Sequence, residues 1–263
     1  MLLRQHLRHL LTRTILKPGK VRSIWRGPLR GCRYLADDLS GWSHLYGGWE
    51  PYAQAVYQRH VRPGYTVYDL GANTGMHALL FSKLVGAGGR VLAFEPLPLN
   101  IDRIQSVIRL NGLSNVTIVP KAVSDRTGTA AFDEGPNNFQ GSLTANSGSS
   151  RKRIVETISL DDLIDQGAPA PDFIKMDIEG GEGDALKGFE RHAEHCRPIL
   201  AVDLHTPEQD LLVGDHLRRH NYSVYRIRSS TSKSKDLLTE IRHLDRPWPD
   251  ASGIWGTVLA LPR

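Results

Sequence analysis

The residues best suited to chemistry stand where predicted strands end. Asp69 closes an apolar stretch and is followed by the glycine turn 71–75, and Glu95 closes the next stretch. In an open α/β sheet, ligands bind beyond the carboxyl ends of the strands. We expect Asp69 to face a positive group of a ligand, and exposed N–H groups of the turn to hold a carboxylate. A carboxylate at Glu95 can accept both hydroxyl protons of a ribose.

These features indicate a nucleoside ligand other than a dinucleotide. The turn lacks the Gly-x-Gly-x-x-Gly pattern, which argues against a nicotinamide dehydrogenase. S-adenosylmethionine carries an amino-acid end and a sulfonium cation but no pyrophosphate, and therefore suits an acidic strand end. The cofactor site is predicted to include Asp69, Gly71, Ala72, Asn73, Thr74, Gly75, Glu95, Pro96 and, bordering the adenine after the third strand, Ala122.

A second group of ionisable side chains follows the next two core strands. It comprises Lys175, Asp177, Glu179, Glu182, Asp203 and His205. Methyl transfer requires alignment of the acceptor and exclusion of water, and an alcohol acceptor also benefits from a general base. His205 is the predicted base, since its ordinary pKa lies closest to neutral. Asp177, which can orient acceptor or cofactor, and Lys175 are the other catalytic candidates.

Other roles stay open for this second group. His205 could be a capping or core histidine before the predicted helix N-cap Thr206, and Glu179 and Glu182 could be favourable charges at a helix N-terminus. The set Asp177, Glu179, Asp203 and His205 could instead hold a divalent cation that polarises the acceptor hydroxyl. Because carboxylates are frequent at strand ends, we favour a site without metal.

The elements that must position these residues alternate from residue 64 onward, which is typical of an α/β sheet. The predicted strands are 66–69, 90–95, 116–119, 154–158, 173–177, 198–204, 222–228 and 254–261. The last two have no obvious helix between them, which favours an antiparallel edge strand. A helix is expected to start at Glu179, and Ser159 and Thr206 are predicted N-caps. The polar segment 133–150 is expected to be an active-site lid or a surface excursion.

Several segments together resemble a known family. They are Tyr46–Glu50, Asp69–Gly75, Phe94–Pro96, Ser159–Asp162, and Phe173–Gly180 with Glu182, Leu186 and Gly188. Over roughly residues 45–205, they resemble the FkbM family of S-adenosylmethionine-dependent methyltransferases. Two departures are that Asp203 stands where family members often have glutamate, and that the chain before residue 40 is not covered.

The resemblance implies a class I methyltransferase fold. That fold is a Rossmann-like, seven-stranded, mostly parallel sheet with helices on both faces and an antiparallel last strand. The resemblance also implies O-methylation of a hydroxyl on a small natural product or sugar. It carries the cofactor role onto Asp69, Gly71, Asn73, Gly75 and Glu95, and places Glu50 to reach the amino group of the cofactor. Asp177 is counted with the cofactor residues as well.

The net charge of +5 is unevenly placed. Residues 1–36 hold nine of the 33 Lys and Arg residues and no acidic residue. The rest of the chain therefore has 24 basic and 28 acidic residues. We therefore predict a basic arm of helix and strand over 1–44 and a methyltransferase domain over 45–263. Since the positive charge belongs to the arm, a nucleic-acid partner is not expected.

The start of the arm is predicted to be an amphipathic helix. Its apolar face comprises Leu3, Leu7, Leu10, Leu11 and Ile15. It would pack on the body or on a second subunit, with an anionic membrane surface as the alternative. Its apolar runs are too short to span a bilayer. The two cysteines show no metal-ligand spacing, which indicates reduced thiols in a cytoplasmic protein.

Rival classes fit the sequence less well. An amino-group methyltransferase of nucleic acid would carry Asn/Asp-Pro-Pro-aromatic where this chain has Asp177-Ile178-Glu179, and Cys196 stands at the wrong end of the sheet for a cytosine methyltransferase. A cofactor-binding module without activity, acting through a partner, stays open as an alternative.

Overall fold

Each apolar stretch predicted as a strand after residue 64 forms one in the computed structural model, which describes residues 19–36, 42–134, 143, 152–229 and 236–263. The amphipathic helix predicted for the start of the arm, and nearly all of the lid predicted over 133–150, lie outside these residues. The central sheet contains β3 (Thr66–Leu70), β4 (Arg90–Phe94), β5 (Val116–Val119), β9 (Phe173–Met176), β10 (Ile199–Leu204), β11 (Tyr222–Ile227), β12 (Leu238–Ile241) and β13 (Gly256–Pro262).

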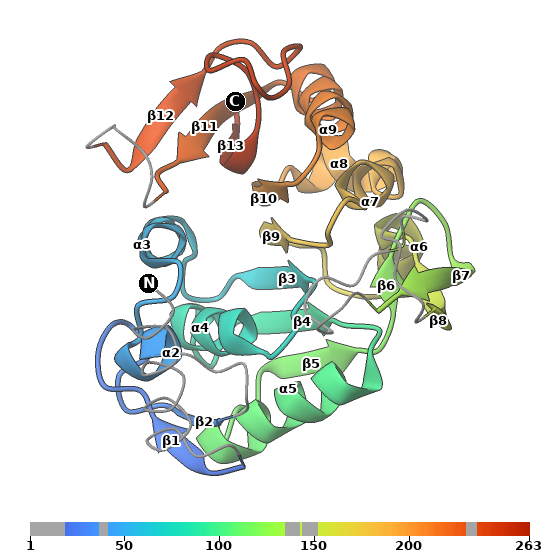
Figure 1. Ribbon diagram of the computed structural model, residues 1–263. Coiled ribbons are helices and arrows are strands. Elements are labelled where there is room, and N and C mark those ends of the chain that lie inside the picture. Colours follow the sequence, from blue (N-terminus) through green and yellow to red (C-terminus); the bar gives the residue numbers. More distant parts are fainter. Residues whose placement is uncertain (1–18, 37–41, 135–142, 144–151, 230–235) are drawn as a thin grey trace.

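The strands follow the order β12-β11-β13-β10-β9-β3-β4-β5, from top to bottom in Figure 1. The pairs from β10 to β5 are parallel, whereas β13 is antiparallel to both β10 and β11. The predicted mostly parallel sheet with an antiparallel last strand is thus confirmed. The expectation that the antiparallel strand lies at the edge is wrong, because β13 inserts between β10 and β11 and leaves β12 outermost.

The strand β12 is an addition to the seven strands expected. It pairs antiparallel with β11, with Val224 opposite Ile241 and Ile227 opposite Leu238. Its four residues are mostly polar or partly exposed, so its alternation was too short to stand out from the surrounding polar segment.

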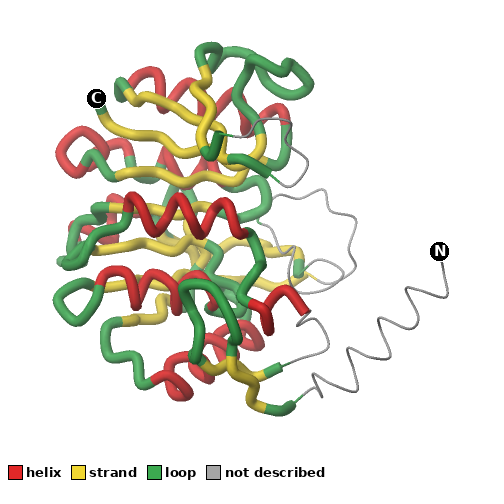
Figure 2. The backbone as a smooth tube through the Cα atoms, turned by 90° about the vertical axis from the view of Figure 1, so that its left-hand side faces the viewer, coloured by secondary structure: helices red, strands yellow, loops and turns green. Residues whose placement is uncertain are grey.

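Helices cover both faces of the sheet, as expected. One face is covered by α3 (Pro51–His60), α4 (Met76–Val85) and α5 (Pro98–Asn111), and the other by α6 (Leu160–Asp165), α7 (Glu182–Lys187), α8 (Glu190–Cys196) and α9 (Pro207–Arg219). Figure 2 shows the strands in yellow running side by side with the helices in red around them. Neighbouring strand residues such as Val67 and Tyr68 enter different cores, since side chains alternate along a strand.

The predicted helix caps are present at both serine and threonine positions. The Ser159 hydroxyl accepts a hydrogen bond from the Asp162 N–H at 3.1 Å, and the Thr206 hydroxyl accepts one from the Gln209 N–H at 3.4 Å. The helix expected from Glu179 begins later, at Glu182. Glu179 and Gly180 have φ values of 55° and 100°, which belong to a turn and not to a helix.

A small side sheet lies beyond the end of β5. It has the order β6-β8-β7, with β6 (Ala122–Val123), β7 (Gly128–Asp133) and β8 (Lys152–Ile158). We predicted β8 but not β7, whose alternation of small residues gives little periodic signal. This sheet carries Phe132 to the candidate site described below.

The described part of the basic arm packs onto the body. It forms β1 (Val21–Ser23) and β2 (Arg33–Leu35), an antiparallel pair followed by the short α2 (Trp42–Tyr46). Asn111 at the end of α5 joins the pair through two hydrogen bonds with the Arg33 backbone, of 2.8 and 2.7 Å. Ile24 and Leu29 enter the same core as α4. The domain boundary near residue 44 remains a prediction.

Within the described ranges, we find no helix that combines the length and the apolar character needed to cross a bilayer.

Candidate active site

The turn after β3 is tied to the neighbouring strand. The N–H groups of Gly71 and Ala72 donate to the Phe94 carbonyl, at 3.1 and 2.9 Å, and the Gly75 N–H donates to the Ala72 carbonyl at 2.8 Å. The Asn73 N–H donates to Glu95 Oε2 at 3.0 Å. These four N–H groups therefore have partners inside the protein. We expected N–H groups of this turn to hold a ligand carboxylate, but these four are not available for it.

Gly71 is required by a close approach between two chain segments. Its φ is 77°, and a Cβ atom placed on it would lie 2.0 Å from the carbonyl oxygen of Asp177. Backbone cannot move aside as a side chain can, so the loops after β3 and β9 fit together only around a glycine. This contact fixes Asp177 against the turn.

Substituting Gly71 by alanine is therefore expected to destabilise the protein by more than about 4 kcal/mol, through both the clash and the positive φ. Gly64→Ala is the matched control, since Gly64 has a φ of 88° and open space where the Cβ would lie. The control should lose only about 1–2 kcal/mol. Urea unfolding measures both, and equal losses would show that the contact with Asp177 is unimportant.

Glu95 is a buried carboxylate held by the backbone on both sides. In addition to the bond from Asn73, its Oε1 accepts a hydrogen bond from the Leu97 N–H at 2.9 Å. Burial raises the pKa of Glu95 to about 7, although the bonds from Leu97, Asn100 and Asn73 favour the ionised form. A carboxylate offers about four acceptor sites. These three bonds therefore leave Glu95 able to accept one more hydrogen bond, from a ligand.

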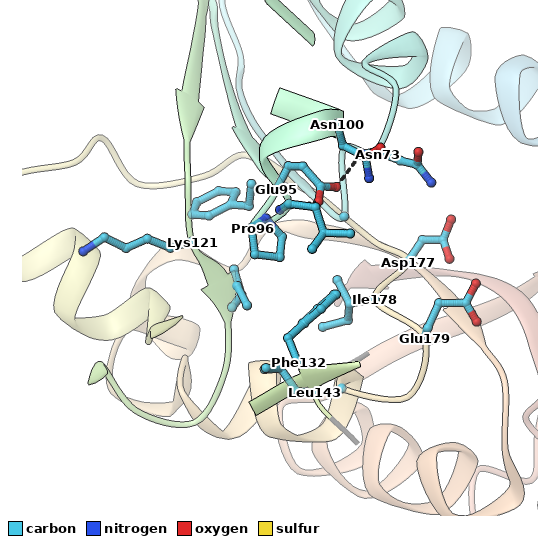
Figure 3. A pocket seen from close by; sticks show the side chains of 16 residues that line it. Asn73, Glu95, Pro96, Asn100, Lys121, Phe132, Leu143, Asp177, Ile178 and Glu179 are labelled. Carbon is cyan, nitrogen blue, oxygen red and sulfur yellow. Dashed lines mark hydrogen bonds between the residues drawn. The ribbon is translucent and has the colours of Figure 1, made fainter. Parts of the chain in front are cut away.

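A pocket open to solvent lies at this end of the sheet (Figure 3). Of the predicted cofactor residues, its walls include Gly71, Asn73, Glu95, Pro96, Ala122 and Asp177. Ala72, Thr74 and Gly75 belong to the turn but do not line the pocket.

The apolar side of the pocket comes largely from residues that the sequence did not single out. Phe132, Leu143 and Ile178 lie together on one side, and Asn73, Asp177 and Glu179 lie on another (Figure 3). Phe132 is on the unpredicted β7, so no sequence pattern pointed to it. Asn100 follows the predicted strand end at Glu95 by five residues. Of the pocket residues that we missed, it was therefore the easiest to predict from the sequence.

Lys175 occupies the centre of a buried charge cluster. Its Nζ lies 3.6 Å from Asp69 Oδ1 and 3.4 Å from Asp177 Oδ2, and donates to the Gly71 carbonyl at 3.2 Å. Burial opposes the charge, but the carboxylates of Asp177, Asp69 and Glu50 raise the pKa of Lys175 above its ordinary value. Lys175 is therefore an ammonium group, which can position its neighbours but cannot act as a base.

Asp69 belongs to this charge cluster, as an ion-pair partner of Lys175, and does not line the pocket. It is fully buried, and the positive group that it meets is Lys175. Neither of its carboxylate oxygens, nor Asn73 Oδ1, has a hydrogen-bond partner among the described residues. Such buried acceptors are costly unless something pairs with them, so the site is suited to a ligand or water that donates hydrogen bonds here.

His205 follows β10 and lies between two carboxylates. Its Nε2 is 3.3 Å from Asp177 Oδ1, and its Nδ1 is 3.7 Å from Glu179 Oε2. The hydrogen bond with Asp177 raises the pKa of His205 to about 9; burial opposes this, and the charges of Glu179 and Asp203 add to it. His205 is therefore largely protonated at neutral pH. Despite burial, Lys175 and His205 hold the pKa of Asp177 far below its usual range.

Three of the four residues considered for a cation come together. Ligand atoms of Asp177, Asp203 and His205 lie within 4.8 Å of one another, while Glu179 is outside this group. Asp203 Oδ1 also accepts a hydrogen bond from the Thr257 hydroxyl at 3.0 Å. A cation would have to displace the proton of His205 and compete with Lys175 for Asp177, so the cluster is a poor match for a metal.

Glu50, in the loop before α3, interacts with Lys175 and does not line the pocket, so its contact with the amino group of the cofactor remains a prediction. Its Oε2 lies 3.3 Å from Nε2 of His77, a buried histidine at the start of α4. Burial opposes ionisation of Glu50, but His77 and Lys175 lower its pKa. His77 packs beside Trp49, with ring centroids 6.1 Å apart. We missed His77, although its place just after Gly75 was a usable signal.

Backbone strain gathers around this pocket. Three of the five non-glycine residues described with left-handed φ are Glu50, Asn73 and Glu179. Such conformations cost energy and tend to cluster at functional sites. Glu182 stabilises the strained turn at Glu179, because its buried Oε1 accepts hydrogen bonds from the N–H groups of Ile178 and Gly180, each at 3.2 Å. Glu182 thus has a structural role, in line with the alternative considered for it.

The comparison with family models agrees with this geometry. Residues 69–229 match the model of the methyltransferase FkbM domain, which begins at Asp69 and spans the pocket, the charge cluster and His205. The chain belongs to the FkbM methyltransferase family. Among curated proteins, this FkbM chain is 30% identical over 143 residues to the hexuronic acid methyltransferase AglP of Haloferax volcanii, covering 53% of the chain and 55% of the relative.

Two further relatives show the range of the family. The methyltransferase sdnD of Sordaria araneosa is 29% identical over 167 residues, covering 51% of this chain and 64% of the relative. The 31-O-demethyl-FK506 methyltransferase FkbM of Streptomyces tacrolimicus is 26% identical over 178 residues, covering 54% and 66%. The FkbM chain thus spans between about half and two thirds of the length of these relatives. A solved methyltransferase FkbM from Methylobacillus flagellatus overlaps it with a TM-score of 0.49 at 23% identity, covering 79% of this chain and 50% of that one.

Proposed function

We propose that this chain is an S-adenosylmethionine-dependent methyltransferase that methylates a hydroxyl group of a small natural product or sugar. The observation that carries the proposal is Glu95, a buried carboxylate with an acceptor site left for a ligand, lining a pocket with an apolar side. This combination suits a nucleoside that stacks its base on apolar side chains and donates a ribose hydroxyl.

The charges around the pocket support this cofactor over a dinucleotide. Asp177, Glu179 and Glu95 line it, and the side chain of Lys121, its one cationic lining residue among those described, points away and pairs with Glu156 at 3.1 Å (Figure 3). A pyrophosphate would be repelled here, whereas a sulfonium and an amino group would be attracted. The unpartnered Asn73 Oδ1 is an acceptor of the kind that an amino group requires.

When bound, S-adenosylmethionine supplies an electrophilic methyl carbon on a sulfonium leaving group. In our proposal, Glu95 and Asn73 orient the cofactor, and Lys175 holds Asp177 in place through their 3.4 Å ion pair. The acceptor hydroxyl loses its proton to His205 in its neutral form, and Asp177 stabilises the imidazolium that results. Since His205 starts largely protonated, only a small fraction of the enzyme is competent at neutral pH.

The side chains next to His205 favour an uncharged acceptor. Glu50, Asp177, Glu179 and Asp203 all surround this end of the site, and an anionic acceptor would meet their charge. The relative named for 31-O-demethyl-FK506 supports a hydroxylated small molecule as the class of acceptor. A hexuronic acid, for which another relative is named, carries a carboxylate that this end of the site would repel.

S-adenosylhomocysteine is expected to raise the melting temperature of the purified protein. Binding should tighten as the pH rises through about 7, because ribose hydroxyls donate to the ionised form of Glu95, whose pKa burial raises to about 7. Glu95→Gln is expected to weaken binding roughly 10- to 100-fold and to remove the pH dependence. Calorimetric titration between about pH 6 and 8 measures both effects.

Glu194→Gln, a substitution of an exposed glutamate on α8, is the matched control and should bind like the wild type. The absence of any shift at saturating ligand in a folded sample would refute the cofactor assignment. Binding that Glu95→Gln leaves intact would instead move the ribose away from Glu95.

A further inference from the structure

The face formed by β1, β2 and α2 carries exposed apolar side chains. Val21 and Leu35 are directly opposite each other in the strand pair and both are exposed. Trp25 and Tyr46 are 50% and 44% exposed and form an edge-to-face pair with ring centroids 5.3 Å apart. We call these four residues the hairpin face; Figure 1 shows β1, β2 and α2 together at one corner of the molecule.

Exposed cations lie in the same chain segment as the hairpin face. Lys20, Arg26, Arg30 and Arg33 have no ion pair with any residue in the described part of the chain, and residues 19–36 contain no acid. By contrast, three exposed arginines on other elements, Arg153, Arg191 and Arg219, are held in ion pairs of 2.6 to 2.8 Å. Unpaired cations beside exposed aromatic rings indicate a surface for an anionic partner.

A recess beside the hairpin continues this charge. It is open to solvent and is lined by Arg30, Lys83 and Asn111 among others, and none of its described lining residues is acidic. The Lys83 ammonium lies 3.6 Å from Cys32 Sγ, a weak acceptor that leaves its charge uncompensated. Two cations in one recess suit an anionic headgroup.

We infer that the hairpin face is a docking surface for an anionic lipid bilayer, with Trp25 and Tyr46 at the level of the headgroups and the arginines of the same segment on lipid phosphates. Amphipathic aromatic rings favour the membrane–water interface, and cations next to them are attracted to anionic lipids. This inference is independent of the methyl-transfer proposal.

Charge distinguishes this occupant from two others. A second copy would place the same cations against each other across a twofold axis, which costs energy. Residues 1–18 also lack acids and hold Arg4, Arg8, Arg13 and Lys17, so as a cover they would be repelled by the hairpin face. A nucleic acid would match the charge but would have no use for the exposed aliphatic pair Val21 and Leu35.

The test is co-sedimentation of the full chain with vesicles of phosphatidylcholine alone, or with about one third phosphatidylglycerol. We expect association with the anionic vesicles only, reduced when salt rises from about 0.05 to 0.5 M. Trp25→Ala should weaken it roughly tenfold. The pair Arg26→Ala and Arg30→Ala should weaken it about 25-fold, at about fivefold for each charge.

Trp248→Ala and Arg126→Ala are the matched controls. Trp248 is 52% exposed and the Arg126 side chain 86% exposed, and both are remote in sequence from the hairpin face. The inference is overturned if the protein does not sediment with anionic vesicles, or if the hairpin variants sediment as well as the controls. It is also overturned if Trp25→Ala abolishes a dimer, or binding to duplex DNA, while vesicle association is absent.

Discussion

Replacing Lys175 by methionine is expected to lower the free energy of unfolding by about 3–5 kcal/mol, the cost of leaving buried charges without their partner. Asp69 is fully buried, and the Lys175 ammonium at 3.6 Å is its one ion-pair partner among the described residues. Asp177, at 3.4 Å, would lose the same neighbour. Urea unfolding at neutral pH measures the effect.

Two further variants separate the charge effect from a simple loss of packing. Adding Asp69→Asn to Lys175→Met should restore part of the lost stability, because it removes the uncompensated charge. Lys187→Met, which breaks an exposed pair with Asp125 at 3.4 Å, should change stability by less than about 1 kcal/mol. If Lys175→Met were no more destabilising than Lys187→Met, the cluster would not depend on the ammonium.

Replacing His205 by glutamine is expected to lower turnover by about 10²- to 10⁴-fold, the usual contribution of a general base, with S-adenosylhomocysteine binding unchanged. In the wild type, turnover should rise with pH up to about 9, since the hydrogen bond with Asp177 raises the pKa of His205 to about 9. Asp177→Asn should move this rise toward the ordinary histidine pKa of about 6.5. Initial rates with a hydroxylated acceptor measure all three.

The same interaction affects stability in the opposite sense. Because the folded-state pKa of His205 lies above its unfolded value, its stabilising contribution is complete below about pH 6.5 and is lost as the pH rises to about 9.

His195→Gln, on the exposed part of α8, is the control for the turnover experiment and should keep the wild-type rate. A His205→Gln variant with full turnover would place the base elsewhere. Loss of turnover with a chelator would instead favour a cation at Asp177, Asp203 and His205.

Much of the sheet could be predicted because its strands carry short, local signals. Val67–Leu70 and Phe173–Met176 are buried at every position and are apolar except for one charged residue each, as expected for strands covered on both faces. Thr206 and Ser159 act as caps within three residues of themselves, so their roles are also local. The strands β7 and β12 were missed because they lack such a local signal: neither has a periodicity that exceeds that of the loops around it.

The residues of the site were likewise predictable where their signal is local in the sequence. By itself, the sequence determined which side chains stand at the strand ends: Asp69, Glu95, Lys175, Asp177 and His205 were all named from their positions. It also determined the family, through motifs that the comparison with residues 69–229 confirms. These features depend on residues adjacent in the chain, or on the rule that parallel strands end at one edge.

Only the tertiary structure decided how these side chains divide the work. Lys175 reaches across to Asp69, so Asp69 is turned from a ligand contact into the partner of a buried ammonium. Asp177 approaches His205 from another strand and keeps it protonated, and Phe132 arrives from a separate sheet. Protonation and pocket shape depend on distances of 3 to 4 Å between residues far apart in sequence. No local pattern encodes such distances, because packing of the whole sheet sets them.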